Sequence, residues 1–256
     1  MKITGDLVFF ITGGASGLGE ATVREIHAKG AKVAVADFNE ERLALLEKEL
    51  KERIFTIKCD VTKEEQVKNA IDKTVEKFGT IHAALACAGI ATVSVTLSSR
   101  GSLDIGLFKS TTEINVYGSV YVAKYAAQVM SKNKPINDKG EKGVIMFVSS
   151  VAAEEGQRGQ VAYSSTKGAI NGIVLPMARD LGRYGIRVLS IAPGIFMTPL
   201  SHAMPENVMK RLNADTAVNR SGTPDEFAHF VTACIENTYL TGVTLRIDGG
   251  IKFSNL

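Results

Sequence analysis

The sequence contains no tryptophan, and its 256 residues include only three cysteines and four histidines. Cys59, Cys87 and Cys234 are widely spaced and odd in number, which excludes a disulfide framework, and we interpret them as core residues. No histidine has a partner at metal-ligand spacing, so no metal site is expected. This cysteine usage is typical of a reducing compartment.

The sequence also lacks a large excess of positive or negative charge, and it lacks long apolar runs. The 30 Lys and Arg residues against 27 Asp and Glu give a net charge of +3, with no block that favours nucleic acid. No apolar run approaches the ~20 residues that span a bilayer. The run from Leu7 to Ile11 is shorter than the apolar part of a secretion signal, which needs about 7–15 residues. We therefore expect a protein that is neither secreted nor membrane-embedded.

Hydrophobic residues make up 45% of the chain, which excludes a disordered protein. Short apolar runs alternate with helical stretches, a pattern typical of parallel sheets with crossover helices. Strands are expected at 7–12, 32–37, 54–58, 81–86, 144–149, 187–192 and 243–247. Helices are expected at 17–29, 40–52, 63–78, 109–131, 163–184 and 225–237, the third starting with a Thr62/Glu65 capping box.

This alternation predicts an α/β fold, a single doubly wound Rossmann domain whose seven-stranded parallel sheet carries helices on both faces. The stretches 91–110 and 131–143 are interpreted as surface loops between elements of one sheet. Neither is a linker, so residues 1–256 are expected to form one domain.

A glycine-rich turn follows the first strand and opens a helix, with the sequence Thr-Gly-Gly-Ala-Ser-Gly-Leu-Gly from Thr12 to Gly19. Glycines there let a backbone approach a pyrophosphate, which the helix N-terminus then faces. A purely structural turn is the alternative. The turn is followed by Asp37, at the end of the second strand, which suits the ribose hydroxyls of NAD and repels the 2′-phosphate of NADP. No basic residue in the turn offsets that repulsion, so the pattern favours NAD.

Tyr163 and Lys167 lie four residues apart on one face of a predicted helix. An ammonium beside a phenol lowers the phenol's pKa, so the pair could exchange a proton with an alcohol. A solvated Tyr/Lys pair is the alternative. Ser150, at the end of the fifth strand, favours the catalytic interpretation because active sites of such sheets lie at those strand ends. The sequence contains neither a hydrolase G-x-S-x-G elbow nor a P-loop.

The chain resembles the short-chain dehydrogenase/reductase family over essentially its full length. The resemblance is carried by the glycine turn, Asp60, Cys87-Ala88-Gly89, Asn115, Ser150, Tyr163/Lys167 and Pro193-Gly194, in the family's order. It implies that Tyr163 is the acid/base, Ser150 orients the substrate oxygen, Lys167 holds the nicotinamide ribose, and Asn115 completes a proton relay. It also implies an NAD site formed by Gly13, Ser16, Gly17, Leu18, Gly19, Asp37, Asp60, Val61, Cys87, Ala88, Gly89, Tyr163, Lys167, Pro193, Ile195 and Thr198.

Within the family the chain is most similar to the enzymes that oxidise 3-hydroxyacyl-CoA to 3-ketoacyl-CoA. That resemblance implies an acyl-CoA substrate, a homotetramer and a place in the mitochondrial matrix or the cytoplasm. The alternatives are a hydroxysteroid or another short-chain alcohol at the same site, or a scaffold protein with incidental dehydrogenase activity. One departure is that the family's common Asn-Asn-Ala-Gly is Ala-Cys-Ala-Gly at 86–89.

The segment 198–217 follows the sixth strand and is expected to form a lid over the substrate. It carries an apolar face suited to a flexible acyl chain, formed by Leu200, Met204, Val208, Met209 and Leu212. Packing of this face on the core is the alternative. Lys210 and Arg211 are candidates to attract an anionic thioester.

Overall fold

Seven parallel strands form one sheet in the order β3-β2-β1-β4-β7-β8-β9 in the computed structural model, which describes residues 1–99, 101–202 and 206–252. The strands are Val8–Thr12 (β1), Lys32–Asp37 (β2), Ile54–Lys58 (β3), Ala83–Ala86 (β4), Gly143–Val148 (β7), Ile186–Pro193 (β8) and Thr244–Ile247 (β9). This order confirms the predicted doubly wound Rossmann sheet. Strands such as β1 and β8 are buried on both faces, as strands of a parallel sheet must be when helices cover both of its sides.

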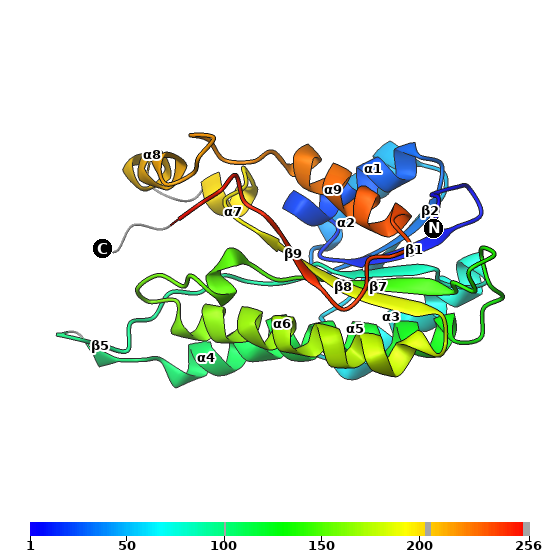
Figure 1. Cartoon of the computed structure of the whole chain (residues 1–256), viewed down its shortest axis with the longest axis horizontal. Helices are drawn as coiled ribbons and strands as arrows, with labels where there is room; N and C mark the ends of the chain where they lie inside the picture. The colour runs from blue at the N-terminus through cyan, green and yellow to red at the C-terminus, as the bar shows by residue number, and fades with distance from the viewer. Residues whose placement is uncertain (100, 203–205, 253–256) are drawn as a thin grey trace.

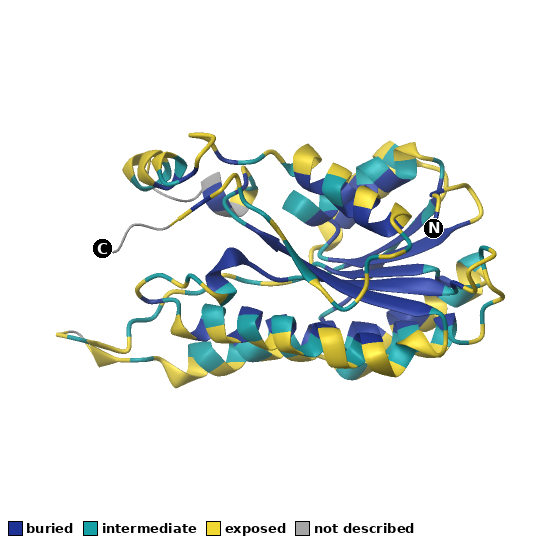
Figure 2. Cartoon of the chain, in the orientation of Figure 1, coloured by how far each residue is buried: buried dark blue, intermediate teal, exposed yellow. Residues whose placement is uncertain are grey.

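Helices cover the two faces of the sheet in separate layers (Figure 1). One layer consists of α1 (Gly17–Ala28), α2 (Glu40–Leu50) and α9 (Pro224–Glu236). The other consists of α3 (Glu64–Phe78), α5 (Gly118–Met130) and α6 (Val161–Gly182). Each layer closes its own apolar core against the sheet, and Figure 2 shows buried strands between helices whose outer faces are exposed.

The strand order reverses at β1: the chain adds β2 and β3 on one side of β1, and then β4 and the later strands on the other side. Ligands of open α/β sheets bind in the crevice that this reversal leaves at the carboxyl ends of the strands. Beyond that edge lie α7 (Pro199–His202), α8 (Glu206–Ala214) and the small hairpin of β5 (Leu97–Ser98) and β6 (Gly101–Ser102).

Three local predictions need correction. Helix α3 starts at Glu64 with Lys63 as an N-cap that makes no side-chain bond, because the Thr62 hydroxyl donates to Asp60 instead. The predicted helix 109–131 is helical as expected, but it begins earlier and consists of α4 (Ile105–Thr112), the π-helix η1 (Glu113–Tyr117) and α5. The predicted loop 91–110 contains the β5–β6 hairpin and the start of α4.

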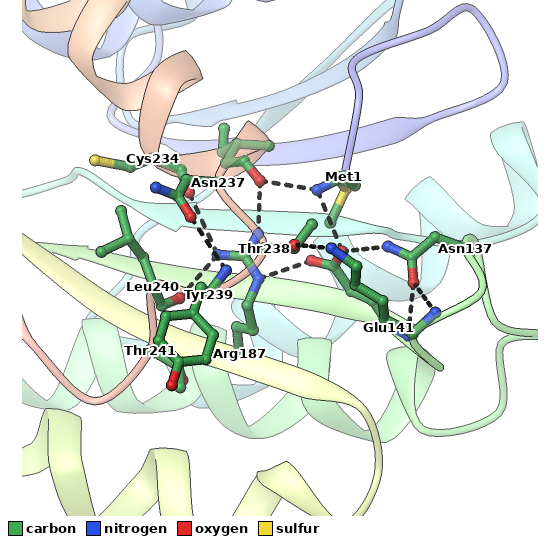
Figure 3. Close-up of polar contacts among 12 residues, drawn as sticks. Met1, Asn137, Glu141, Arg187, Cys234, Asn237, Thr238, Tyr239, Leu240 and Thr241 are labelled. Carbon is green, nitrogen blue, oxygen red and sulfur yellow. Dashed lines mark hydrogen bonds and ion pairs between the residues drawn. The ribbon is translucent and has the colours of Figure 1, made fainter.

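The polar stretch 131–143 is also not wholly a surface loop, because it places Glu141 in a buried ionic cluster (Figure 3). One Glu141 oxygen accepts from Arg187 Nε at 2.7 Å, and the other lies 3.2 Å from the Met1 amino group. Arg187 also donates to the carbonyls of Cys234, Ile235 and Leu240. The cluster therefore ties β8 to the end of α9 at the sheet edge opposite the crevice. Among the described helices, none is both long and apolar enough to cross a membrane.

Candidate active site

A cavity of about 730 Å³ lies at the carboxyl ends of the central strands. It is lined by every predicted cofactor-binding residue and by Ser150, Tyr163 and Lys167, whereas the predicted Asn115 does not line it. Residues that the sequence analysis did not single out include Phe38, Ile90, Ile114, Gln160, Phe196 and Ser201. These residues follow or face the strand ends, but they belong to no motif, so only the folded chain identifies them.

The glycine turn forms one end of the cavity, and the structure shows why it needs glycine. Gly13 has φ +65°, and a Cβ there would lie 2.7 Å from Ala88 Cα. A Cβ on Gly19 would lie 2.1 Å from the Gly13 carbonyl oxygen. The turn therefore packs backbone against backbone, which leaves the N-terminus of α1 facing the cavity, as an anionic phosphate requires.

Asp37 ends β2 beside this turn. One of its carboxylate oxygens accepts from the Ala15 N–H at 3.1 Å and the other from the Asn39 N–H at 3.0 Å. Both oxygens are thus held by backbone donors, and each retains a free lone pair. The half-buried carboxylate borders the cavity together with Phe38, whose ring is 70% exposed. Asp60 and Val61, which follow β3, line the same end.

The departure at 86–89 leaves a thiol in the cavity wall. Cys87 is only partly buried and lines the cavity, so the expectation of a core residue is wrong for Cys87. Cys59 and Cys234 are buried as expected, although Cys59 also borders the cavity. Desolvation raises the pKa of the Cys87 thiol to about 12, despite the opposing effect of Lys167. The thiol is therefore neutral and poorly nucleophilic. The Thr12 hydroxyl accepts from the Ala88 N–H at 3.3 Å and joins β1 to β4 at this point.

Ser150 and Tyr163 meet at the other end of the cavity. Ser150 follows β7 and caps the 3₁₀-helix η2 (Val151–Ala153), where its hydroxyl accepts from the Ala152 N–H at 3.1 Å. The Ser150 side chain also faces the Tyr163 phenol closely enough to lower the pKa of that phenol. Burial has the larger effect, so the pKa of Tyr163 lies above its ordinary value of 10.0.

Lys167 lies one helical turn after Tyr163, with its Nζ 5.6 Å from the centre of the phenol ring. The ammonium donates to the Val148 carbonyl at 2.8 Å. Burial lowers the pKa of Lys167 to about 8. The arrangement places a phenol, a hydroxyl and an ammonium on one wall, which can deliver or accept a proton at an alcohol oxygen.

Asn115 stands behind this wall in the π-helix η1, and it is only 1% exposed. Its amide donates to the Ile90 carbonyl and to the Thr166 hydroxyl, while its oxygen accepts from the Ile90 N–H at 2.9 Å. The side chain therefore connects the segment after β4 to the helix that carries Tyr163. π-Helical turns are frequent at functional sites.

The turn after β8 closes the cavity beside the glycines. Pro193, Ile195 and Thr198 line it, and the Thr198 side chain lies against Gly17, where a Cβ would be 3.5 Å from Thr198 Cγ2. Thr198 N–H donates to the Ser201 hydroxyl at 2.8 Å. In the expected lid, Leu212 is buried, Val208 and Met209 are half-buried, and Met204 lies outside the described residues. Lys210 forms a surface ion pair with Glu206.

Comparison with known proteins agrees with this geometry. Residues 13–252 match the family model described as enoyl-(acyl carrier protein) reductase. The chain belongs to the short-chain dehydrogenase/reductase family. It is 41% identical to human 3-hydroxyacyl-CoA dehydrogenase type-2 over 96% of this chain and 95% of that protein. The type-2 enzyme of Drosophila melanogaster is 40% identical over 96% and 97% of the two chains.

Two solved structures extend the comparison. The type-2 dehydrogenase of Mycobacterium avium superposes with a TM-score of 0.92 at 35% identity, covering 98% of both chains. The 3-ketoacyl-(acyl-carrier-protein) reductase of Brucella melitensis, a complex with NADH, superposes with a TM-score of 0.87 at 25% identity, covering 95% of this chain and 97% of that one. The protein is therefore an oxidoreductase that uses a nicotinamide cofactor to interconvert a secondary alcohol and a ketone. Within the described residues, no cluster of His, Cys, Asp or Glu could hold a metal ion.

Proposed function

We propose that this protein is an NAD-dependent dehydrogenase that oxidises 3-hydroxyacyl-CoA to 3-ketoacyl-CoA, and that Tyr163 is its acid/base. The observation that carries the proposal is that Ser150, Tyr163 and Lys167 together line the cavity, with Lys167 Nζ 5.6 Å from the centre of the Tyr163 ring. Relatives at about 40% identity over nearly the whole chain carry the name of this activity. The presence of Ser150, Tyr163 and Lys167 together in the cavity also argues against a scaffold protein without a catalytic role.

The choice of NAD over NADP rests on Asp37. Its carboxylate is fixed by two backbone N–H groups and borders the cavity, so it can accept from ribose hydroxyls but opposes a 2′-phosphate. When bound, the nicotinamide supplies the hydride chemistry. The tight backbone packing at Gly13 and Gly19 leaves room for the pyrophosphate at the N-terminus of α1.

The chain's own residues hold and move the proton. Tyr163 takes the proton from the substrate hydroxyl during oxidation and returns it during reduction. Ser150 donates to the same oxygen and fixes its position. The buried Lys167 ammonium, anchored on the Val148 carbonyl, favours the phenolate and holds the nicotinamide ribose. Asn115 keeps the segment after β4 in contact with this helix. The resemblance to the family further assigns it a place in a proton relay through water.

Segment 198–217 is the proposed lid. Its first residues, Thr198, Pro199 and Ser201, line the cavity, and α8 presents half-buried Val208 and Met209. A flexible acyl chain can pack on such side chains more easily than a rigid steroid, because methionine adapts its shape.

A direct comparison of substrates tests the assignment. We expect a higher kcat/KM for the reduction of acetoacetyl-CoA with NADH than for the oxidation of any hydroxysteroid with NAD. The opposite ranking would overturn the acyl-CoA assignment and leave the dehydrogenase assignment standing. Lack of turnover with both classes, by a folded protein that binds NADH, would favour the scaffold alternative.

A further inference from the structure

An ionic cluster beside the cavity joins two distant parts of the chain. Glu155, between Ser150 and Tyr163 in the sequence, accepts from Arg246 of β9 at 2.7 Å and from Lys252 at 2.7 Å. Arg246 also contacts Asp248 at 2.6 Å. The side chains of Glu155 and Asp248 are 21% and 13% exposed, whereas Arg246 is 32% and Lys252 79% exposed, so the cluster lies at the surface with its carboxylates turned inward.

Glu155 belongs to the loop that carries the proposed catalytic hydroxyl. Its N–H donates to the Val151 carbonyl at 2.9 Å, in the turn that the Ser150 hydroxyl caps. The next residue, Gly156, packs directly on the neighbour of Tyr163, because a Cβ there would lie 2.2 Å from Ser164 Oγ. A shift of Glu155 would therefore move the loop that separates Ser150 from Tyr163.

The other side of the cluster, segment 246–252, touches two further walls. The Ile247 carbonyl accepts from the Gly194 N–H at 3.0 Å, and Gly194 lines the cavity. The Gly249 carbonyl accepts from the Ala217 N–H at 2.9 Å, at the end of the proposed lid. The Lys252 N–H donates to the Asp215 carbonyl at 3.1 Å.

We propose that Glu155 and Arg246 are positioning residues that hold the Ser150 loop in register with the β8 turn and with the end of the lid segment. The proposal rests on the proposed roles of Ser150 and Tyr163. Neither Glu155 nor Arg246 lines the cavity, so both act through the backbone segments that they join.

The physical effect is on geometry more than on stability. Ion pairs near the surface contribute about 0–1 kcal/mol, so loss of the cluster leaves the fold intact. Displacement of a catalytic group by about 1 Å can cost a factor of 10² in rate. Loss of the cluster therefore lowers kcat while the melting temperature changes little.

The test compares the variants Glu155→Gln and Arg246→Met with the parent protein and with Glu49→Gln. Glu49 is a matched control, because it pairs with Arg24 at 2.6 Å on the outside of α2 and lies outside the cavity. We expect kcat for acetoacetyl-CoA reduction to fall roughly tenfold in the two cluster variants, while the KM for NADH and the melting temperature stay near those of the parent. Glu49→Gln should match the parent in every measurement.

Two readouts separate positioning from a structural defect. Amide hydrogen exchange without cofactor should speed up in residues 151–164 and 215–218 in both cluster variants, but not elsewhere or in the control. High salt should lower the parent's kcat toward that of Glu155→Gln and leave that variant unchanged, because the screening length falls to about 3 Å at 1 M.

A kcat within twofold of the parent in both variants, or faster exchange spread over the whole chain, would overturn the proposal. If the parent fails to reduce any 3-ketoacyl thioester, the proposed substrate is wrong. In that case hydrogen exchange without cofactor still tests the positioning role of Glu155 and Arg246. Unchanged exchange in residues 151–164 of both variants would refute that role.

Discussion

Removal of the buried Glu141 charge is expected to destabilise the fold severely. Glu141 lies between two cations, the Arg187 guanidinium at 2.7 Å and the Met1 amino group at 3.2 Å, and all three groups are buried. Glu141→Gln keeps the shape but removes the carboxylate that bonds both cations. Breaking one partner of a buried ion pair costs about 3–5 kcal/mol. For a chain of this size, that loss corresponds to a fall in melting temperature of roughly 6–20 °C.

Urea unfolding of Glu141→Gln, Arg187→Met and the double variant measures this loss. The double variant should lose at least about 1 kcal/mol less than the sum of the single variants, because contacting residues couple. Asp72→Asn, which removes a surface pair with Lys68, is the control and should change the free energy of unfolding by less than about 1 kcal/mol. Activity per folded molecule should persist, because the cluster lies opposite the cavity. A loss below about 1 kcal/mol in Glu141→Gln would refute the reasoning.

Three further predictions concern the cavity. Asp37→Ser should narrow the preference for NAD over NADP from at least about 10²-fold to near parity, because a like-charge contact costs several kcal/mol; an unchanged ratio of kcat/KM values would refute this. Gly13→Ala should destabilise the fold by about 2–4 kcal/mol and abolish NADH binding, since φ is +65° and the Cβ would meet Ala88, whereas Gly172→Ala, with open space around it, should not. The kcat/KM for alcohol oxidation should rise with pH toward the raised pKa of Tyr163, because oxidation needs the deprotonated phenol, and that for ketone reduction should fall at high pH; parallel profiles would contradict the assignment.

Much of this architecture is predictable from the sequence because strong local signals agree with it. The apolar β strands and the glycine turn locate the sheet and its crevice, and the spacing of Tyr163 and Lys167 places both side chains on one wall. Each of these signals depends on a few neighbouring residues.

Features that depend on long-range packing, or on which of several nearby side chains binds a cap, escaped prediction. Glu141 looks like part of a polar surface loop, and partners far away in the sequence, Arg187 and the Met1 amino group, make its burial possible. The capping box predicted at Thr62 is absent because Asp60 binds the hydroxyl, whereas a capping box that was not predicted opens α9 at Thr223 and Glu226. The π-helix at Asn115 has no local sequence signature.

The kinetics of Tyr163→Phe test the central claim most directly. The ring is retained and only the hydroxyl is lost, so NADH affinity and melting temperature should match those of the parent. The kcat for acetoacetyl-CoA reduction should fall by about 10²–10⁴-fold, the usual contribution of general acid–base catalysis. A kcat within a few-fold of the parent would remove Tyr163 from the mechanism and contradict the account.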